Sequence, residues 1–335
     1  MKKYKALKIV GIVLASILLF MLIINLIPPK KNVESNPFVV EKGQLPMIAA
    51  HRGGGECNPE NTMLAFREAV ETYGVEIIES DLYLTKDGYL VYNHDSYIDE
   101  TCNVNGDITL EEVKEICKDS SKRHYIADMT LEELRQYNFG YYFSDKEGNR
   151  PYKEETSLAE NGLQIATIEQ LFEEFYESNP NLLFIVEIKN EGERGYESCR
   201  ILNETLNKYP NYRNRIVVGT FHDEIEVELK TKYPDLYRGA PTGTAAKFVI
   251  TQILKVNIFN NSDFACLQIP TSYDVGITIN LDKRTFIKRA HRRNIAVQYW
   301  TINDAETMRK LIELGCDCIM TDNPELLKSV LDEYR

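Results

Sequence analysis

Short apolar runs alternate with amphipathic, helix-periodic segments along the chain after residue 45. The runs contain nearly continuous apolar residues, which is typical of strands buried on both faces of a parallel sheet. They lie at 47–51, 76–83, 182–189, 215–220, 236–240, 264–269, 295–300 and 317–320. Helices are predicted between and after them, at 61–73, 167–178, 194–209, 223–233, 244–256, 282–293, 304–314 and 323–333. Eight β/α units in this order predict an α/β fold, a (β/α)8 TIM barrel, with a doubly wound open sheet as the alternative.

One long polar stretch interrupts this rhythm after the second predicted strand. Residues 89–94 extend that strand, and residues 95–165 are polar, rich in tyrosine and carry short helical patterns at 109–117 and 130–137. An insertion after a barrel strand lies on the C-terminal face, where the active sites of barrels are found. The insertion is therefore expected to shape a substrate pocket.

An uncharged apolar segment precedes the predicted barrel. Residues 9–27 are long enough to cross the hydrocarbon core as a helix. Four lysines precede this segment and two follow it, which favours a cytoplasmic N-terminus. The sequence predicts a single-pass cell-membrane protein with a basic cytoplasmic N-terminus (1–8), a transmembrane helix (9–27), a linker (28–45) and an extracytoplasmic barrel domain (46–335). A cleaved signal peptide is the alternative, although the segment exceeds the usual length and no A-x-A site follows it.

Charge is unevenly distributed along the 335 residues. Six of the 39 Lys and Arg residues lie in positions 1–31, so the remaining body holds 33 basic against 51 acidic residues, a net charge of −18. Such a body repels nucleic acid, and no nucleic-acid partner is expected. A phosphate substrate stays compatible with this charge, because a bound cation sets the local potential. The seven cysteines contain no C-x2-C pair of the kind that zinc sites and redox motifs use.

Carboxylates gather on the second and third predicted strands. Glu79 and Asp81 stand two residues apart on one strand, so their side chains point the same way, and Glu187 adds a third carboxylate from the next strand. Like charges in one site repel unless a proton or a cation joins them. Three oxygen ligands suit one divalent cation, Mg²⁺ or Ca²⁺, rather than zinc. Ordinary ion pairs with Arg52 or Lys189 are the alternative use of these carboxylates.

Two histidines, His51 and His94, end apolar runs on the same predicted face. Imidazole exchanges protons near neutral pH, so a histidine pair beside a cation site fits acid–base cleavage of a phosphodiester. One would take a proton from the attacking hydroxyl, and the other would give one to the leaving oxygen. Two structural histidines are the alternative. His222 follows a strand and is a weaker candidate, whereas His124 and His291 lie in polar segments and are expected to be structural.

The strongest motif begins at Ala50 and reads AHRGGGECNPENTMLAFREAVETYGVEIIESDLYLTKDGYLVYNHD. It resembles the signature of the glycerophosphodiester phosphodiesterase family, which joins an HRG turn, a PENT helix start, an E-x-D strand, a T-x-DG hairpin and an HD pair. Further matches are VEIK at 186–189, WTIN at 300–303 and MTDNPELL at 320–327, so the resemblance covers residues 46–333. It implies a bacterial-type, membrane-anchored member of this family with a TIM barrel.

The resemblance implies a role for each matching residue. His51 and His94 match the acid–base pair, and Glu79, Asp81 and Glu187 match the ligands of one divalent cation. The residues that match phosphate or substrate contacts are Arg52, Lys189, Trp300, Glu60 and Asn61. Residues 95–165 resemble the family's insertion after strand 2. In this family the adjacent glycerol hydroxyl is thought to attack phosphorus, giving a cyclic phosphate that water then opens.

The implied reaction is hydrolysis of a glycerophosphodiester to glycerol 3-phosphate and an alcohol. One alternative keeps the site and changes the substrate to a lysophospholipid or a glycerol-phosphate polymer, for which residues 141–143 hint at an apolar groove. The other alternative is an inactive barrel that binds at the cell surface, which would lack a site residue that is present here. Gly55, Glu56 and Cys57 lengthen the turn before PENT, and the role of Cys57 stays open.

Overall fold

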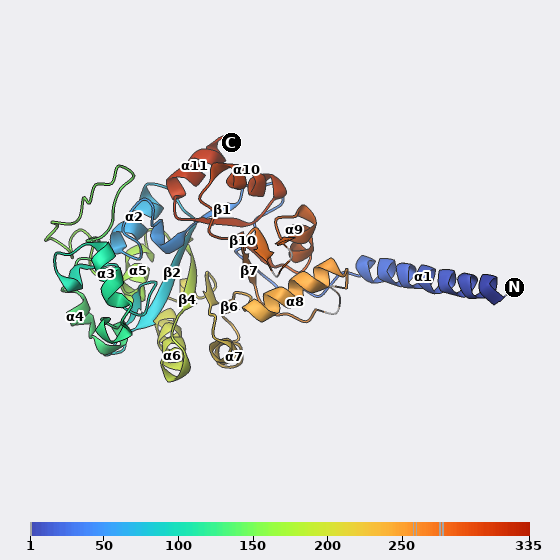
Figure 1. Cartoon of the computed structure of the whole chain (residues 1–335), viewed down its shortest axis with the longest axis horizontal. Coiled ribbons are helices and arrows are strands. Elements are labelled where there is room, and N and C mark those ends of the chain that lie inside the picture. The colour runs from blue at the N-terminus through green and yellow to red at the C-terminus, as the bar shows by residue number, and fades with distance from the viewer. Residues whose placement is uncertain (1, 257, 259, 275, 277) are drawn as a thin grey trace.

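The computed structural model describes residues 2–256, 258, 260–274, 276 and 278–335. Met1, the first residue of the predicted basic N-terminus, lies outside the described residues. Parallel strands surround a central axis (Figure 1): β1 (Met47–Ala50), β2 (Ile77–Leu84), β4 (Leu183–Ile188), β5 (Ile216–Gly219), β6 (Tyr237–Arg238), β7 (Cys266–Ile269), β10 (Ala296–Tyr299) and β11 (Cys318–Thr321). Each coincides with a strand that the sequence predicts.

The strands close into a ring. They follow the order β6-β5-β4-β2-β1-β11-β10-β7. The end strands β6 and β7 also meet, because the Ala240 N–H donates to the Cys266 carbonyl and the Ala265 N–H donates to the Arg238 carbonyl, both at 2.9 Å. The predicted barrel is thus confirmed and the open-sheet alternative is wrong. Closure removes the exposed edge strands and places the C-terminal strand ends around one mouth.

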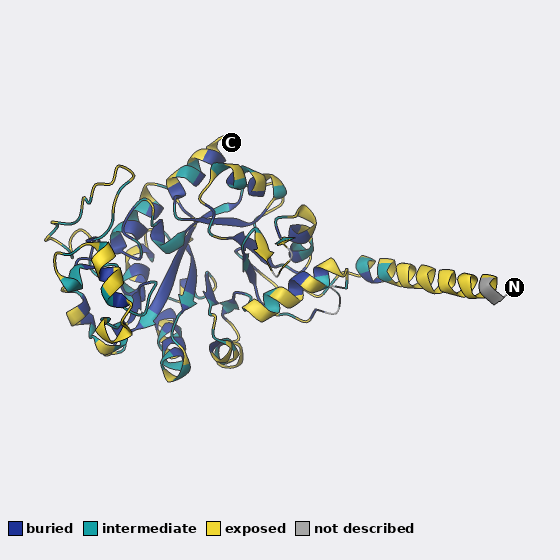
Figure 2. Ribbon diagram, in the orientation of Figure 1, coloured by how far each residue is buried: buried dark blue, intermediate teal, exposed yellow. Residues whose placement is uncertain are grey.

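Helices form the outer layer of the barrel (Figures 1 and 2): α2 (Met63–Glu71), α5 (Ile168–Phe175), α6 (Gly192–Lys208), α7 (Asp223–Lys232), α8 (Thr242–Ile253), α9 (Arg284–His291), α10 (Ala305–Leu314) and α11 (Pro324–Asp332). Several begin at a polar cap. Thr62 accepts from the Ala65 N–H, and Asn323 accepts from the Leu326 N–H. Such caps satisfy donors that the first helical turn leaves unpaired, which fixes where these helices start.

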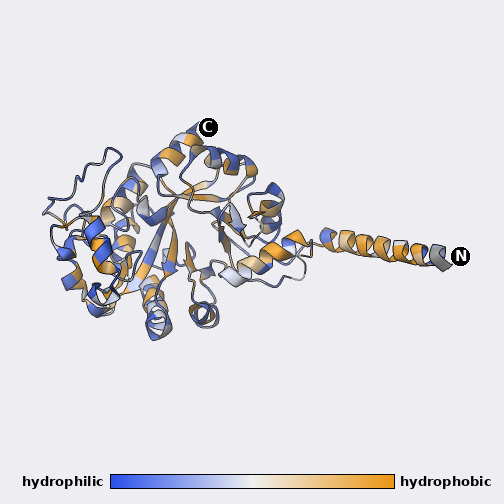
Figure 3. Ribbon diagram, viewed as in Figure 1, coloured by the Kyte–Doolittle hydropathy of each residue, from blue (hydrophilic) through white to orange (hydrophobic). Residues whose placement is uncertain are grey.

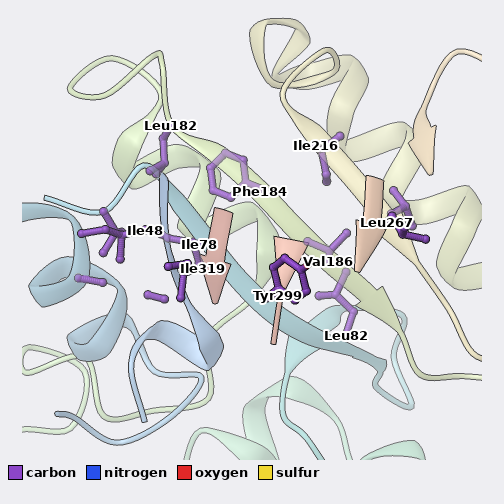
Figure 4. Packing of buried hydrophobic residues seen from close by; sticks show 14 of the residues in the cluster. Ile48, Ile78, Leu82, Leu182, Phe184, Val186, Ile216, Leu267, Tyr299 and Ile319 are labelled. Atoms are coloured by element: carbon purple, nitrogen blue, oxygen red, sulfur yellow. The ribbon is translucent and has the colours of Figure 1, made fainter. Parts of the chain in front are cut away.

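Two apolar layers hold the barrel together. The outer layer, part of which Figure 4 shows, packs Phe184, Val186 and Tyr299 between the sheet and the helices. The inner layer uses the alternate strand positions and includes Ala49, Ile77, Val217, Ala296 and Cys318. Successive strand residues face opposite sides, which explains how one apolar run supplies both layers.

Residues 28–45, the predicted linker, pack against the N-terminal end of the barrel. Phe38 is fully buried in the inner apolar layer. The Asn36 amide donates to the carbonyls of Ala265 and Asn294, both at 2.9 Å. The Asp317 carboxylate accepts from the Val40 N–H at 3.0 Å. This segment is therefore the floor of the barrel, opposite the mouth.

The insertion after β2 is a small subdomain with its own core. β3 (Leu90–Tyr92) pairs antiparallel with β2, and α3 (Leu110–Cys117) and α4 (Leu131–Leu134) follow it. Its buried residues include Val91, Ile98, Cys102, Ile126 and Leu134. A short hairpin after β7, formed by β8 (Ser272–Asp274) and β9 (Thr278–Asn280), is not predicted from the sequence. The 3-10 turns are η1 (His51–Gly53), η2 (Asn103–Asn105), η3 (Ser120–Lys122), η4 (Ile126–Asp128) and η5 (Pro210–Tyr212).

Helix α1 (Lys2–Leu26) projects away from the barrel, and most of its side chains from Tyr4 onward are exposed and apolar (Figures 1 to 3). Residues Tyr4–Leu26 are long and apolar enough to span a membrane by length and composition. The last turn of α1 is docked on the barrel. The Asn25 amide donates to the Lys255 carbonyl at 2.8 Å, and the Arg292 guanidinium donates to the carbonyls of Asn25 and Ile27 at 3.1 and 3.2 Å. These bonds satisfy carbonyls that a helix end leaves unpaired.

Candidate active site

The turn after β1 places His51 and Arg52 at the barrel mouth. Arg52 adopts a left-handed backbone with φ of 53°, and the next two glycines have φ of 83° and 94°. A Cβ on Gly53 would lie 2.9 Å from the Phe66 ring, so this position requires glycine. The turn aims the Arg52 N–H at the Glu79 carboxylate, to which it donates at 2.9 Å. The local sequence thus joins strands β1 and β2 at the site.

His51 is held by an acid that the sequence analysis did not single out. Its Nδ1 lies 2.5 Å from Oδ1 of Asp322, which follows β11. The other oxygen of Asp322 accepts from the Asn303 amide at 2.7 Å. Burial lowers the pKa of His51, but the bond to Asp322 and the charge of Glu79 outweigh burial, so the pKa is raised. With Nδ1 engaged, Nε2 faces Glu79, whose Oε2 lies 3.9 Å away.

Three carboxylates meet beside this dyad. Glu79 and Asp81 are both buried on β2, and Asp81 stands opposite Glu187 in the register between β2 and β4. Burial, followed by the negative charge of Asp81, raises the pKa of Glu79 to about 7. The Lys189 ammonium bridges Asp81 and Glu187 at 3.0 and 2.9 Å. The ion-pair alternative is thus present for these two carboxylates.

Arg52 links the carboxylates to the PENT segment. Its guanidinium donates to Glu60 at 3.0 Å and lies 3.5 Å from Asp81. The Asn61 N–H donates to the Arg52 carbonyl at 2.8 Å, and Asn61 also has a left-handed backbone, with φ of 58°. The buried side-chain amide of Asn61 has no hydrogen-bond partner among the described residues. Glu60 and Asn61 therefore set the position of Arg52 in this structure.

His94 and Trp300 lie at the rim of the same mouth. His94 follows β3, and its Nδ1 is 3.2 Å from an Asp95 oxygen. Burial raises the pKa of Glu187, whereas Lys189 and, more weakly, His94 oppose this shift, which places His94 within electrostatic reach of the carboxylates. Trp300 follows β10 and exposes its ring.

The residues at the mouth fit a divalent cation. Oδ2 of Asp81 is buried and accepts no hydrogen bond from the described residues, and the Arg52 guanidinium lies 3.5 Å from it, so this oxygen faces positive charge and could act as a ligand. Glu79 and Glu187 add two carboxylates, so the donors are all oxygens, as Mg²⁺ and Ca²⁺ prefer. A second group at the rim, formed by Glu191, His222 and Glu224, has one ligand atom from each residue within 4.8 Å of the others.

The remaining histidines have structural contacts. His124 Nδ1 lies 2.8 Å from the buried Asp99, and His291 Nε2 lies 2.7 Å from the buried Asp317. His222 Nε2 lies 3.1 Å from the Lys189 carbonyl, which places His222 beside the mouth. All seven cysteines are free, and burial raises the pKa of the Cys57 thiol, which disfavours a reactive thiolate.

Comparison with protein families identifies the class of this molecule. The family model described as the glycerophosphoryl diester phosphodiesterase family matches residues 51–326, a range that holds every predicted site residue. With the barrel fold and the polar mouth, this match defines the chain as a phosphoric diester hydrolase. The chain belongs to the glycerophosphoryl diester phosphodiesterase family.

Individual relatives agree with this assignment. The chain is 26% identical over 282 residues to a glycerophosphodiester phosphodiesterase of Caldanaerobacter subterraneus, covering 84% of this chain and 96% of that relative. It is also 24% identical over 298 residues to the lysophospholipase D GDPD1 of Mus musculus, covering 85% of this chain and 86% of that relative. These two relatives are similarly identical to the chain but are named for different substrates.

Solved structures show the same fold. A glycerophosphodiester phosphodiesterase from Agrobacterium tumefaciens superimposes with a TM-score of 0.61 at 16% identity, covering 85% of this chain and all (100%) of that structure. An Oleispira antarctica phosphodiesterase, solved in complex with the product sn-glycerol-3-phosphate, gives a TM-score of 0.60 at 20% identity and covers 86% of this chain and 97% of that one.

Proposed function

We propose that this chain hydrolyses glycerophosphodiesters to glycerol 3-phosphate and an alcohol, with His51 and His94 as the acid–base pair. The observation that carries the proposal is the Asp322–His51 dyad beside the buried carboxylates Glu79 and Asp81. Asp322 accepts the Nδ1 proton of His51 and leaves Nε2 to exchange protons at the mouth. A carboxylate in this place also stabilises the imidazolium that forms when Nε2 accepts a proton.

The proposed reaction proceeds in two displacements. The glycerol hydroxyl next to the phosphate gives its proton to His51 as its oxygen bonds to phosphorus, and the leaving alcohol takes a proton from His94 as its bond to phosphorus breaks. Water then opens the cyclic phosphate, and the two histidines exchange roles. Arg52 and Lys189 bind the negative phosphate oxygens, and Trp300 forms a wall beside the glycerol.

We propose that Glu79, Asp81 and Glu187 hold one divalent cation, Mg²⁺ or Ca²⁺. When bound, such a cation supplies polarisation of the phosphoryl oxygens. The buried oxygen of Asp81 that accepts no hydrogen bond and the raised pKa of Glu79 support this placement. Glu60 and Asn61 keep Arg52 aligned beside the carboxylates through the bonds described above.

The proposed organisation has a basic cytoplasmic N-terminus (1–8), a membrane span (9–27) and a catalytic barrel outside the cytoplasm (46–335). The lysines at the N-terminal side of α1 support this orientation. Because α1 joins the barrel at the floor, the mouth opens at the far end from the membrane exit. This placement favours water-soluble, deacylated diesters over lysophospholipids of the same membrane.

A lysophospholipase D-type activity is the second candidate, favoured by exposed aromatic side chains at the mouth. Phe221 follows β5, Tyr273 lies in β8 after β7, and Trp300 follows β10. Strands β5, β7 and β10 are close in the ring, and all three residues are exposed. The aromatic cluster at 141–143 does not add to this surface, because Tyr141 is buried in the insertion and its hydroxyl donates to Asp107. The relative from Mus musculus bears this activity in its name.

The test uses the full chain in detergent, with glycerophosphocholine and lysophosphatidylcholine as substrates. Release of glycerol 3-phosphate from the soluble diester is expected after Mg²⁺ or Ca²⁺ is restored to the EDTA-treated protein. Calorimetric titration is expected to show one cation site in the native chain that Asp81→Asn weakens strongly. Activity that persists unchanged after complete metal removal would contradict the cation site. A clear preference for the lysolipid, lost in Phe221→Ala with Tyr273→Ala, would move the function to the second candidate.

A further inference from the structure

The part of the barrel around the docked end of α1 carries a charge opposite to that of the rest. Residues 236–262 and 283–294, which include α8 and α9, contain nine Lys and Arg residues and no Asp or Glu; two of the nine, Arg238 and Arg293, are buried, and the other seven are exposed or partly exposed. The chain outside positions 1–31 has a net charge of −18, so this segregation is strong. A basic surface on an acidic protein indicates a partner with negative charge.

Helix α8 adds an exposed apolar stripe to this basic surface. Ile250, Ile253 and Leu254 are each more than half exposed and stand three and four residues apart, so they lie on one side of the helix. Figure 3 shows this apolar end of α8 pointing toward α1. Exposed Lys255 follows the stripe directly. An apolar stripe bordered by basic residues is typical of helices that lie at a membrane interface.

Helix α9 presents a basic stripe beside the apolar stripe of α8. Lys288 and Arg292 are exposed and four residues apart, hence one above the other on the helix surface. The two helices are joined, because the Arg289 guanidinium donates to the Gln252 carbonyl at the end of α8. We name the exposed residues Ile250, Ile253, Leu254, Lys255, Lys288 and Arg292 the α8–α9 face.

The α8–α9 face lies next to the point where α1 would leave the membrane. Asn25 in the last turn of α1 bonds to Lys255, and Arg292 bonds to Asn25 and Ile27. A helix rises about 1.5 Å per residue, so Ile250 is only about 7 Å along α8 from Lys255. The headgroup layer on each side of the hydrocarbon core is about 5–8 Å thick. The length of the face along α8 is therefore comparable with the thickness of the headgroup layer.

We propose that the α8–α9 face contacts the anionic lipid surface of the membrane that α1 spans. The apolar stripe reaches the acyl boundary, and the basic residues pair with phosphate headgroups. This inference rests on the membrane anchor proposed above. It fixes the orientation of the barrel, with the floor against the bilayer and the mouth in the aqueous phase.

The test places a tryptophan in the face and measures its depth. The full chain is reconstituted in vesicles that contain phosphatidylglycerol, with or without brominated acyl chains that quench tryptophan at short range. Ile253→Trp is compared with Val227→Trp on α7, because the native residues are 59% and 58% exposed. Quenching at position 253 is expected to exceed that at position 227 at least twofold. Equal quenching at both positions overturns the inference.

A charge test accompanies the depth test. Lys255→Glu with Lys288→Glu, made in the Ile253→Trp chain, is expected to remove at least half of the extra quenching. The matched control Lys114→Glu with Lys118→Glu, in α3 and directly after it in the insertion, is expected to leave the quenching unchanged. Vesicle flotation separates the two proposals: a chain that does not float with the vesicles refutes the anchor and the inference together. A chain that floats without extra quenching at position 253 refutes the inference alone.

Discussion

The two ends of the barrel use the same strands for opposite purposes. On β2 the inward residues change from Ile77, buried in the apolar inner layer, to Glu79 and Asp81 within four positions. At the floor, Phe38 and its neighbours fill the interior with apolar side chains. At the mouth, buried charges face one another. The comparison shows that stability and chemistry are divided along the length of each strand, as the barrel fold allows.

The difference between floor and mouth also determines how burial affects charged groups. Burial at the floor is favourable because the buried groups are apolar. Burial at the mouth opposes the charged form of Glu79, whose pKa rises to about 7. The mouth therefore costs stability that the floor and the outer helices supply, which is usual for functional sites.

The largest effect is expected at the mouth. His94→Ala should lower turnover of glycerophosphocholine by about 10²–10⁴-fold, because a positioned acid–base group contributes a factor of this size. His222→Ala, beside the mouth but bonded to a backbone carbonyl, should change turnover only a few-fold. Steady-state rates of the full chain check both. A similar loss of turnover in the two variants would contradict the proposed catalytic role of His94.

The floor should respond in the opposite way. Phe38→Ala removes a fully buried ring and should lower the free energy of unfolding by about 3–5 kcal/mol. Turnover per folded molecule should stay near the native value, since Phe38 lies at the end away from the site. Denaturant unfolding measures the first quantity, with the exposed Val227→Ala as a control that should change it by less than about 0.5 kcal/mol. If Phe38→Ala lost turnover but kept native stability, the contrast between floor and mouth would be contradicted.

A smaller change is expected from Asp322→Asn. The carboxylate raises the pKa of His51 against the effect of burial, so its removal should lower that pKa and move the matching limb of the pH–rate profile to lower pH. The maximal rate should also fall, since His51 loses its orientation. A fall in rate with an unmoved profile would mean that Asp322 acts only on the fold.

The smallest effect concerns stability against pH without metal. The pKa of Glu79 is raised in the folded state, so the folded protein binds more protons than the unfolded chain between its ordinary value and about 7. Stability should therefore fall as pH rises through this window. Glu79→Gln should reduce that fall, measured as the difference in melting temperature between pH 5 and pH 8 in EDTA. If Glu79→Gln leaves this difference in melting temperature unchanged, the pH dependence of stability does not come from Glu79.

Much of the fold could be predicted from the sequence because the apolar runs and helical periods repeat regularly. The strands around the ring and their helices follow from this local signal. The floor could not be predicted, since residues 28–45 are mostly polar and Phe38 is the apolar side chain among them that is fully buried. The β8–β9 hairpin is too short and too exposed to leave a pattern.

The site shows the same limit. The sequence groups Glu79, Asp81 and Glu187 because strand periodicity sets their direction. It does not pair His51 with Asp322, because 271 residues separate them and only ring closure brings β1 beside β11. A signal was present, since Asp322 ends the last strand and lies within the MTDNPELL match. The support from Asn303 could not be predicted, because it depends on side-chain geometry at the rim.

The most direct test follows the reaction of glycerophosphocholine by phosphorus NMR, with the full chain and with His51→Ala. The account predicts metal-dependent conversion to glycerol 3-phosphate by the native chain. It predicts loss of nearly all of this conversion in His51→Ala, while the denaturation midpoint stays close to native. Undiminished conversion by a folded His51→Ala chain, or no conversion by the native chain with any divalent cation, would contradict the account.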